Sequence, residues 1–210
     1  MRSSRGARYK IRYGKVILVI LMISIIFGFV FDFICTQVEH YMYPKPPEYA
    51  SFVTEYSQKY RVPEHLVYAV IKTESKFDST AESSVGALGL MQIMPDTFSW
   101  LTNDKLGDRF STGMLYDPET NIKYGVYYLS WLYDRYGDWD IALAAYNAGP
   151  GNVDKWLEDP TVSDLETGKL VNIPFKETRE YVKKVNKAFD KYDSLYDKNQ
   201  KIHISERNKK

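Results

Sequence analysis

The hydrophobic positions of the chain follow two different patterns. Residues 16–34 are apolar almost without interruption, with Asp32 as their one charged residue, whereas residues 48–196 mix apolar and polar positions at helical spacing. A helix that is apolar on every side is typical of a membrane span. At about 1.5 Å per residue, residues 16–34 nearly match a hydrocarbon core of about 30 Å. The pattern therefore predicts one transmembrane helix followed by one folded domain.

Basic residues in front of the apolar segment predict its direction. Six of residues 1–15 are Lys or Arg and none is acidic, so the positive-inside rule places this basic head in the cytoplasm and the chain beyond Cys35 outside. Phe33-Ile34-Cys35 lacks the small residues of a signal-peptide cleavage site, and the bulky Ile34 fits a lipoprotein site poorly. We therefore expect an uncleaved, single-pass anchor in the cell membrane.

The segments on either side of the domain differ from it in composition. Residues 35–47 end in a Pro-rich stretch that predicts a linker holding the domain off the bilayer. Residues 48–196 form the predicted domain, and residues 197–210, which are charged and lack aromatic side chains, are expected to be a disordered tail. Because Cys35 is the only cysteine, the chain has no internal disulfide and no Cys-based metal site.

Helix signals recur through the whole predicted domain. Pro at an early helix position, Asp before it and Gly after the last turn mark the ends of helices. Between them remain three long loops, 75–90, 103–117 and 158–174, which are long enough to build a cleft. The domain is therefore expected to be all-α, with helices starting at Pro63-Glu64, Pro95 and Pro118 and others at 139–149, 151–157 and 175–196.

Glu74 is the principal candidate for catalysis. On a helix it falls in the middle of the apolar stripe formed by Leu66, Val67, Val70 and Ile71. An ionised carboxylate is costly to bury, so such a group is paired, protonated or lines a cavity. By spacing alone, a buried ion pair or a helix end emerging into solvent accounts for Glu74 better than catalysis does.

The stretch after Glu74 changes this balance. Residues 83–95, SSVGALGLMQIMP, are rich in small residues and glycines, which allow a ligand to approach the backbone closely. Gln92 adds a side-chain amide that both donates and accepts hydrogen bonds. Together these features predict a polar or polymeric substrate lying against the Glu74 carboxylate.

Four motifs in order resemble one enzyme family. They are ESKF at 74–77, AESSVGALGLMQIMP at 81–95, AAYNAGPG at 144–151 and ETREYV at 177–182. Together they resemble the lytic transglycosylases of the soluble murein transglycosylase type, which have a lysozyme-like fold, over nearly all of residues 50–190. The resemblance implies peptidoglycan as substrate, cleaved at the β-1,4 bond between N-acetylmuramic acid and N-acetylglucosamine with formation of a 1,6-anhydro ring. It implies no cofactor and no metal.

The implied chemistry explains why one catalytic carboxylate is enough. The glycosidic oxygen leaves once it is protonated, so the catalyst must hold a proton near neutral pH, and apolar surroundings raise the pKa of a Glu. Retaining and inverting glycosidases need a second carboxylate. In this family the substrate's N-acetyl group is thought to take the place of the second carboxylate. The resemblance implies that Glu74 acts first as the acid and then as the base that accepts the proton of the sugar's 6-hydroxyl.

The resemblance also implies a set of substrate-binding residues. Packing alone would also explain Tyr146, helix termination would explain Asn147, and gap filling would explain Met91. Glu177 and Arg179 are expected to form an ion pair that stabilises the fold. The substrate-binding residues carried over from the family are Ser83, Met91, Gln92, Tyr146, Asn147 and Tyr181.

Two other functions remain open. One is a muramidase of the same fold that adds water, with Asp78 or Glu82 as its base, and the other is a non-catalytic protein that binds the cell wall. Intact Glu74, Gln92 and Tyr146 count against the second. The sequence names no partner beyond peptidoglycan and the membrane, although envelope or cell-wall machinery would suit an anchored enzyme.

Charge and histidine placement exclude other classes. Beyond Cys35 the acidic residues outnumber the basic ones by four, which argues against nucleic acid as a partner. His40, His65 and His203 are scattered, and His65 projects opposite Glu74 on its helix. They predict neither a metal site nor a Ser–His pair, and all three are expected to be solvated.

Overall fold

The structure, a computed structural model, describes residues 13–107 and 111–196. They divide into two compact units at the bond between Met42 and Tyr43. The predicted disordered tail, His203 and all of the basic head but its last three residues lie outside the described residues.

The described part of the first unit is one long helix, α1 (Tyr13–Met42). Within Val16–Met42, a stretch of 18 residues has a mean hydropathy of 2.9 and none of it is buried, so the helix is long and apolar enough to cross a membrane. The helix continues seven residues beyond Cys35 and so includes much of the predicted linker. It ends before Tyr43-Pro44, because a residue that precedes proline is disfavoured in the helical conformation.

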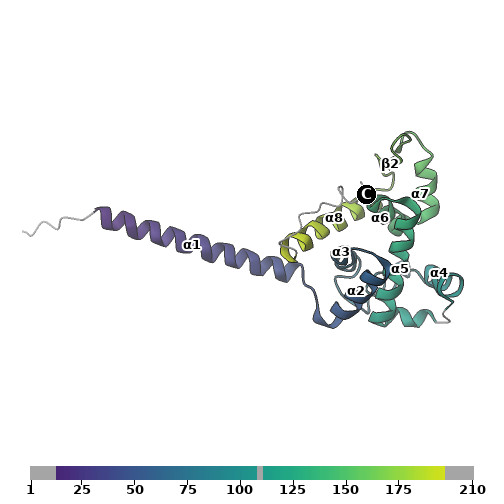
Figure 1. Cartoon of the computed structure of the whole chain (residues 1–210), viewed down its shortest axis with the longest axis horizontal. Helices are drawn as coiled ribbons and strands as arrows, with labels where there is room; N and C mark the ends of the chain where they lie inside the picture. Colours follow the sequence, from purple (N-terminus) through teal and green to yellow (C-terminus); the bar gives the residue numbers. More distant parts are fainter. Residues whose placement is uncertain (1–12, 108–110, 197–210) are drawn as a thin grey trace, which may run out of the picture. The chain divides into compact units, whose positions relative to one another are not determined.

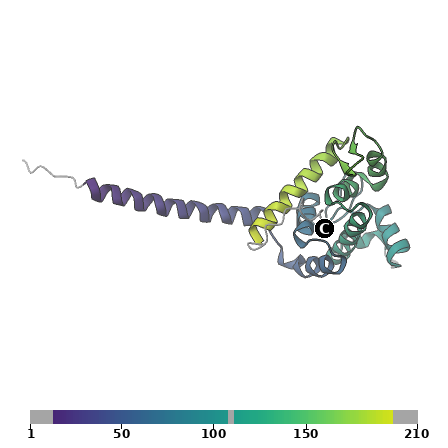
Figure 2. The same ribbon diagram turned by 45° about the horizontal axis from the view of Figure 1, so that its top comes forward.

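In the described part of the second unit, almost all of the regular secondary structure is helical, as predicted (Figures 1 and 2). The elements are α2 (Pro47–Tyr60), α3 (Glu64–Glu74), α4 (Pro95–Trp100), a π-helical turn (Leu101–Leu106), a 3-10 turn (Thr112–Tyr116), α5 (Pro118–Tyr136), α6 (Trp139–Ala148), α7 (Pro150–Leu157), a hairpin of β1 (Ser163–Asp164) with β2 (Lys169–Leu170), and α8 (Lys176–Tyr196). Helices α3 and α8 pack together, α6 packs against both α5 and α8, and α2 covers α5.

The ends of the helices follow the predicted signals. The Asp117 carboxylate accepts a hydrogen bond from the Thr120 backbone N–H at 2.9 Å and so caps α5, whose first residue is a proline. Gly137, with φ of 67°, ends the same helix. The expected loop at 103–117 is wrong in part, because the π-helical turn and the 3-10 turn occupy much of it.

The predicted apolar stripe of α3 is confirmed. Leu66, Val67, Val70 and Ile71 are all fully buried, and each such side chain contributes about 1.5–3 kcal/mol through removal from water. The opposite face is covered too. The His65 ring lies 3.4 Å from the Asp193 carboxylate of α8, and its side chain is only 14% exposed. The expectation that His65 is solvated is therefore wrong, and burial lowers the pKa of its imidazole.

One buried amide holds the loop that follows α3. Asn121, fully buried on α5, donates to the Leu88 and Leu115 carbonyls at 2.9 and 2.7 Å and accepts from the Met91 backbone N–H at 2.7 Å. Gly89 makes this possible, because a Cβ at that position would lie 2.3 Å from the Asn121 amide nitrogen. Its φ of +75° also favours glycine. The loop is thus fixed to α5 by one side chain.

We expect Asn121→Ala to destabilise the domain by about 3 kcal/mol, because two carbonyls and one N–H would lose their buried partners. Urea denaturation followed by circular dichroism measures this change. Asn172→Ala, at an exposed position, is the matched control and should change stability by less than about 0.5 kcal/mol. Equal effects of the two substitutions would show that Asn121 does not fix the loop.

Candidate active site

Glu74 is the last residue of α3, and Ser75 ties this helix end to the neighbouring loop. The Ser75 hydroxyl donates to the Leu90 carbonyl at 2.8 Å and accepts from the Phe77 backbone N–H at 3.1 Å. These two hydrogen bonds thus fix, relative to Glu74, the loop between α3 and α4, residues 76–94, which contains the sequence GLMQ at 89–92 and is called the GLMQ loop below.

The backbone around Glu74 is strained. Lys76, Phe77 and Gln92 have φ of 54°, 71° and 49°, in the left-handed region that residues with a Cβ adopt at a cost of about 1–2 kcal/mol each. Phe77 packs against Tyr68, with ring centroids 6.4 Å apart. Strain of this kind concentrates at functional sites, where the surrounding structure holds it in place.

The Glu74 carboxyl has a raised pKa. Burial is the main cause and the negative charge of Glu177 adds to it, whereas the Tyr181 hydroxyl acts in the opposite direction; together they raise the pKa of Glu74 to about 7. The Tyr181 hydroxyl is itself buried and, among the described residues, forms no hydrogen bond of full geometry. The two groups therefore interact without a fully formed hydrogen bond, and Glu74 retains its proton up to near-neutral pH.

Tyr146 lies close to Glu74, as the motif resemblance implies. Burial, with the negative charge of Glu74 adding to it, holds the pKa of the Tyr146 hydroxyl well above its usual value, so the hydroxyl stays protonated. It donates to the Met91 carbonyl at 2.8 Å, and its ring lies 5.3 Å from that of Tyr128. Tyr146 thus joins α6 to the GLMQ loop beside the carboxyl.

A cleft of about 280 Å³ is lined in part by Tyr146. Three of the expected residues line it, Gln92, Tyr146 and Asn147, whereas Glu74 does not. Tyr146 interacts with Glu74 and also faces the cleft. The remaining lining residues come from the loop, α4, α5, the end of α6 and the start of α7: Ile93, Met94, Thr97, Tyr128, Ala148, Gly149 and Pro150.

The loop residues expected to bind sugar also shape the loop itself. The Gln92 amide nitrogen donates to the Ala81 and Gly89 carbonyls at 3.1 and 2.9 Å, and the Ser83 hydroxyl accepts from the Ala87 backbone N–H at 2.9 Å. Gln92 still lines the cleft.

Met91 occupies the core rather than a cleft wall. Its side chain is fully buried, and a Cβ at position 125 would lie 2.4 Å from its sulfur, so Gly125 provides its space. Of the two roles open for Met91, gap filling is the one the structure supports, and a cleft wall built by its side chain is wrong.

Residues at the start of α8 complete the site. The Thr178 hydroxyl donates to the Asn147 side-chain oxygen at 2.8 Å, so Asn147 joins α6 to α8 rather than ending its helix. The expected ion pair between Glu177 and Arg179 is wrong: Arg179 donates to the Ile173 carbonyl at 2.5 Å, and no salt bridge joins the two in the described chain. Glu177 is exposed, and its charge acts on Glu74 instead.

The two carboxylates considered as a second catalytic group are engaged elsewhere. Asp78 accepts from the Thr80 backbone N–H and hydroxyl at 2.8 and 2.7 Å, which lowers the pKa of its carboxyl. Glu82 accepts from the Tyr116 hydroxyl at 3.1 Å. Neither is among the charges that shift the pKa of Glu74, whereas Glu177 is.

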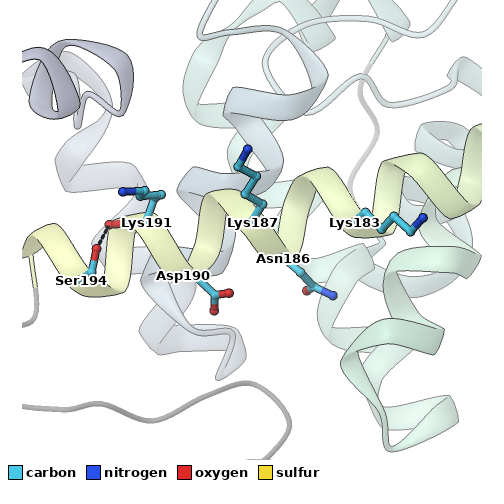
Figure 3. A pocket seen from close by; sticks show the side chains of 6 residues that line it. All are labelled: Lys183, Asn186, Lys187, Asp190, Lys191 and Ser194. Atoms are coloured by element: carbon cyan, nitrogen blue, oxygen red, sulfur yellow. Dashed lines mark hydrogen bonds between the residues drawn. The ribbon is translucent and has the colours of Figure 1, made fainter.

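A second hollow of about 490 Å³ lies along α8 (Figure 3). Its described lining comes from this one helix, contains no aromatic side chain and includes none of the expected site residues. Figure 3 shows Asn186 and Asp190 on one side of the helix and Lys187 on the other. The hollow therefore has the features of a solvated helix face, with Lys183, Asn186, Lys187, Asp190, Lys191 and Ser194 around it.

Two residues that position the site were missed by reasoning from the sequence. Asn121 carries a signal that could have revealed it, because it is a lone amide on the apolar face of α5 beside Ile122 and Gly125. Thr178 carries none: its hydroxyl gains its role only when α8 packs against α6.

Known proteins resemble this chain in sequence. Residues 51–165 match the model of the transglycosylase SLT domain. The chain is 39% identical over 149 residues to the soluble lytic murein transglycosylase of Escherichia coli K12, covering 70% of this chain and 23% of that protein. It is 31% identical over 166 residues to membrane-bound lytic murein transglycosylase C of Haemophilus influenzae, covering 69% of this chain and 46% of that protein.

Solved structures give the same result. The 70 kDa soluble lytic transglycosylase Slt70 of E. coli superposes with a TM-score of 0.65 and 34% identity, over 76% of this chain and 26% of that one. The Slt enzyme of Pseudomonas aeruginosa, in an inactive Glu-to-Gln form, superposes with a TM-score of 0.65 and 33% identity, over 77% of this chain and 26% of that one. The chain thus spans about a quarter of the length of the soluble relatives. With the family model covering more than half of its residues, this chain belongs to the transglycosylase SLT family, that of the soluble and membrane-bound lytic murein transglycosylases.

Proposed function

We propose that this chain is a membrane-anchored peptidoglycan lytic transglycosylase that cleaves the β-1,4 bond after N-acetylmuramic acid and leaves 1,6-anhydro ends. The observation that carries the proposal is the raised pKa of Glu74, because a carboxyl that keeps its proton near pH 7 can protonate a glycosidic oxygen. The Glu-to-Gln replacement in the inactive P. aeruginosa relative is consistent with a glutamate as catalyst.

In the proposed reaction Glu74 acts twice. It first gives its proton to the leaving glycosidic oxygen as the bond to the sugar's anomeric carbon breaks, and the substrate's N-acetyl oxygen bonds to that carbon. Glu74, now ionised, then accepts the proton of the 6-hydroxyl, whose oxygen displaces the acetamido oxygen and closes the anhydro ring. Tyr181 stabilises the ionised form, since its hydroxyl lowers the pKa of Glu74.

The surrounding residues have separate proposed roles. Gln92, Tyr146 and Asn147 line the cleft and bind sugar groups there, with Tyr128 offering an aromatic face. Ser83 contributes by shaping the loop. Tyr146 and Tyr181 stay protonated because burial and the charge of Glu74 raise the pKa of each hydroxyl, so both remain hydrogen-bond donors.

We also propose that α1 anchors the enzyme in the cell membrane, with the second unit outside. Its support is the length and apolar character of Val16–Met42, the basic residues ahead of it, and a relative that is named membrane-bound. In this arrangement residues 1–15 are cytoplasmic and the glycan-cleaving domain, about residues 48–196, faces the wall.

We expect Glu74→Gln to lower the rate of glycan cleavage by about 10³-fold, because the amide has no acidic proton to give. Binding of glycan fragments and the helical circular dichroism spectrum should be unchanged. Glu55→Gln, at an exposed position on α2, is the matched control and should retain full activity. Cleavage by Glu74→Gln at the wild-type rate would reject Glu74 as the catalyst.

The pH profile should depend on two neighbours in opposite directions. Because the acid form of Glu74 is required, kcat/KM should fall by about tenfold per pH unit above the Glu74 pKa of about 7. Tyr181→Phe removes a group that lowers this pKa, so the fall should move to higher pH. Glu177→Gln removes a group that raises it, so the fall should move to lower pH. Shifts with the opposite signs would contradict this electrostatic arrangement.

The products distinguish a lyase from a hydrolase. We expect mass spectrometry of digested peptidoglycan to show anhydro ends, which are lighter than reducing ends by one water. A hydrolase would use a second carboxylate as its base, and Glu177 is the one whose charge acts on Glu74. If the wild-type enzyme instead produced reducing ends, and Glu177→Gln lost the ability to produce them, the result would support the muramidase.

A further inference from the structure

No free spacer separates α1 from the second unit. α1 runs unbroken to Met42, and the next four residues, 43–46, belong to the second unit and pack on its helices. The Tyr192 hydroxyl of α8 donates to the Pro44 carbonyl at 2.9 Å, and the Tyr196 hydroxyl donates to the Tyr43 carbonyl at 3.0 Å. Two tyrosines of one helix therefore hold the backbone of this segment.

Side chains of the segment add further contacts. Lys45 Nζ donates to the Glu64 carboxylate of α3 at 2.9 Å and lies 4.8 and 4.9 Å from the ring centroids of Tyr68 and Tyr196. Its side chain is only 20% exposed. Cation–π contacts of this kind contribute about 0.5–1 kcal/mol each where exposed and more where desolvated. Lys45 is thus held by both α3 and α8.

Tyr43 completes the packing. Its ring meets the Tyr192 ring edge-on at 5.7 Å, and Lys72 Nζ lies 4.7 Å from its centroid. α2 begins directly after the segment, at Pro47. Residues 43–46 are therefore part of the folded unit, so the linker predicted at residues 35–47 is divided between α1 and the second unit, which meet at the junction between Met42 and Tyr43.

This arrangement limits how far from the membrane Glu74 can lie. From Cys35, which follows the apolar run, to Met42, α1 adds eight residues, or about 12 Å at 1.5 Å per residue. A domain of roughly 150 residues has a radius of gyration of about 15 Å and hence a diameter of about 40 Å. Whichever way the second unit turns at the junction, Glu74 lies within about 50 Å of the hydrocarbon boundary.

We propose that this short coupling restricts the enzyme to glycan at the membrane surface, namely newly polymerised strands still attached to a lipid carrier. The proposal rests on the proposed function and its membrane anchor. The reaction that supplies such a substrate is a glycosyl transfer that elongates a lipid-linked glycan at the outer face of the cell membrane. Finished wall at a greater distance is excluded, because a tether that cannot span the gap gives an effective concentration near zero.

The test uses the full chain in lipid vesicles and lengthens its tether. A Gly/Ser segment of about 60 residues inserted between Met42 and Tyr43 adds an r.m.s. reach of about 40 Å. The matched control carries the same segment after Lys210, where it leaves the tether unchanged. Two substrates are supplied: lipid-linked glycan strands polymerised in the same vesicles, and purified sacculi added outside. Anhydro products are measured for each.

We expect all three proteins to cleave the lipid-linked strands at similar rates. The tether insertion should increase cleavage of sacculi by about tenfold over both the wild type and the control. Equal cleavage of sacculi by wild type and tether insertion would overturn the proposal. In detergent, where no tether acts, all three should cut soluble glycan equally; failure of the wild type there would instead refute the proposed function.

Discussion

The cost of removing a carboxylate from water is the constraint on which this site depends. Glu74 ends a helix whose apolar stripe is fully buried, so its ionised form is poorly solvated and the pKa of the carboxyl rises to about 7. The same carboxyl at the end of a solvated helix would be ionised at neutral pH and unable to act as an acid. The charge of Glu177 and the hydroxyl of Tyr181 adjust this value in opposite directions.

Burial raises the pKa of Glu74 only if the residues around the carboxyl keep their positions. Here the GLMQ loop is fixed from three sides, by Ser75 of the α3 end, Asn121 of α5 and Tyr146 of α6. Each hydrogen bond reaches a backbone group of the loop, so the loop's path depends little on the identity of its own side chains. The left-handed backbone of Lys76, Phe77 and Gln92 persists within this frame. Strain in the backbone and polar contacts in the core thus support each other.

Much of the fold follows from local signals in the sequence. Asp117 and Gly137 bound α5 as predicted, and the apolar stripe of α3 is buried, because caps and helical spacing act over a few residues. The predictions that were wrong depend on contacts between distant segments. His65 is covered only because α8 folds over it, and the expected ion pair of Glu177 and Arg179 does not form because Arg179 turns to the Ile173 carbonyl. The site residues could be selected through their motifs, whereas Thr178 and the buried state of Met91 depend on packing that no local pattern encodes.

Met91 joins the interior of the domain to the proposed sugar-binding surface. Its thioether fills the space left by Gly125, its N–H is bound by Asn121, and its carbonyl receives the Tyr146 hydroxyl. A change in how Met91 packs in the core would therefore also move Tyr146 in the cleft. Evolution or engineering toward greater heat tolerance has little freedom to enlarge residue 125, since any added methyl group would displace the residue that orients Tyr146. Homologues that differ at these two positions should differ together, with a larger residue on α5 matched by a smaller one in the loop.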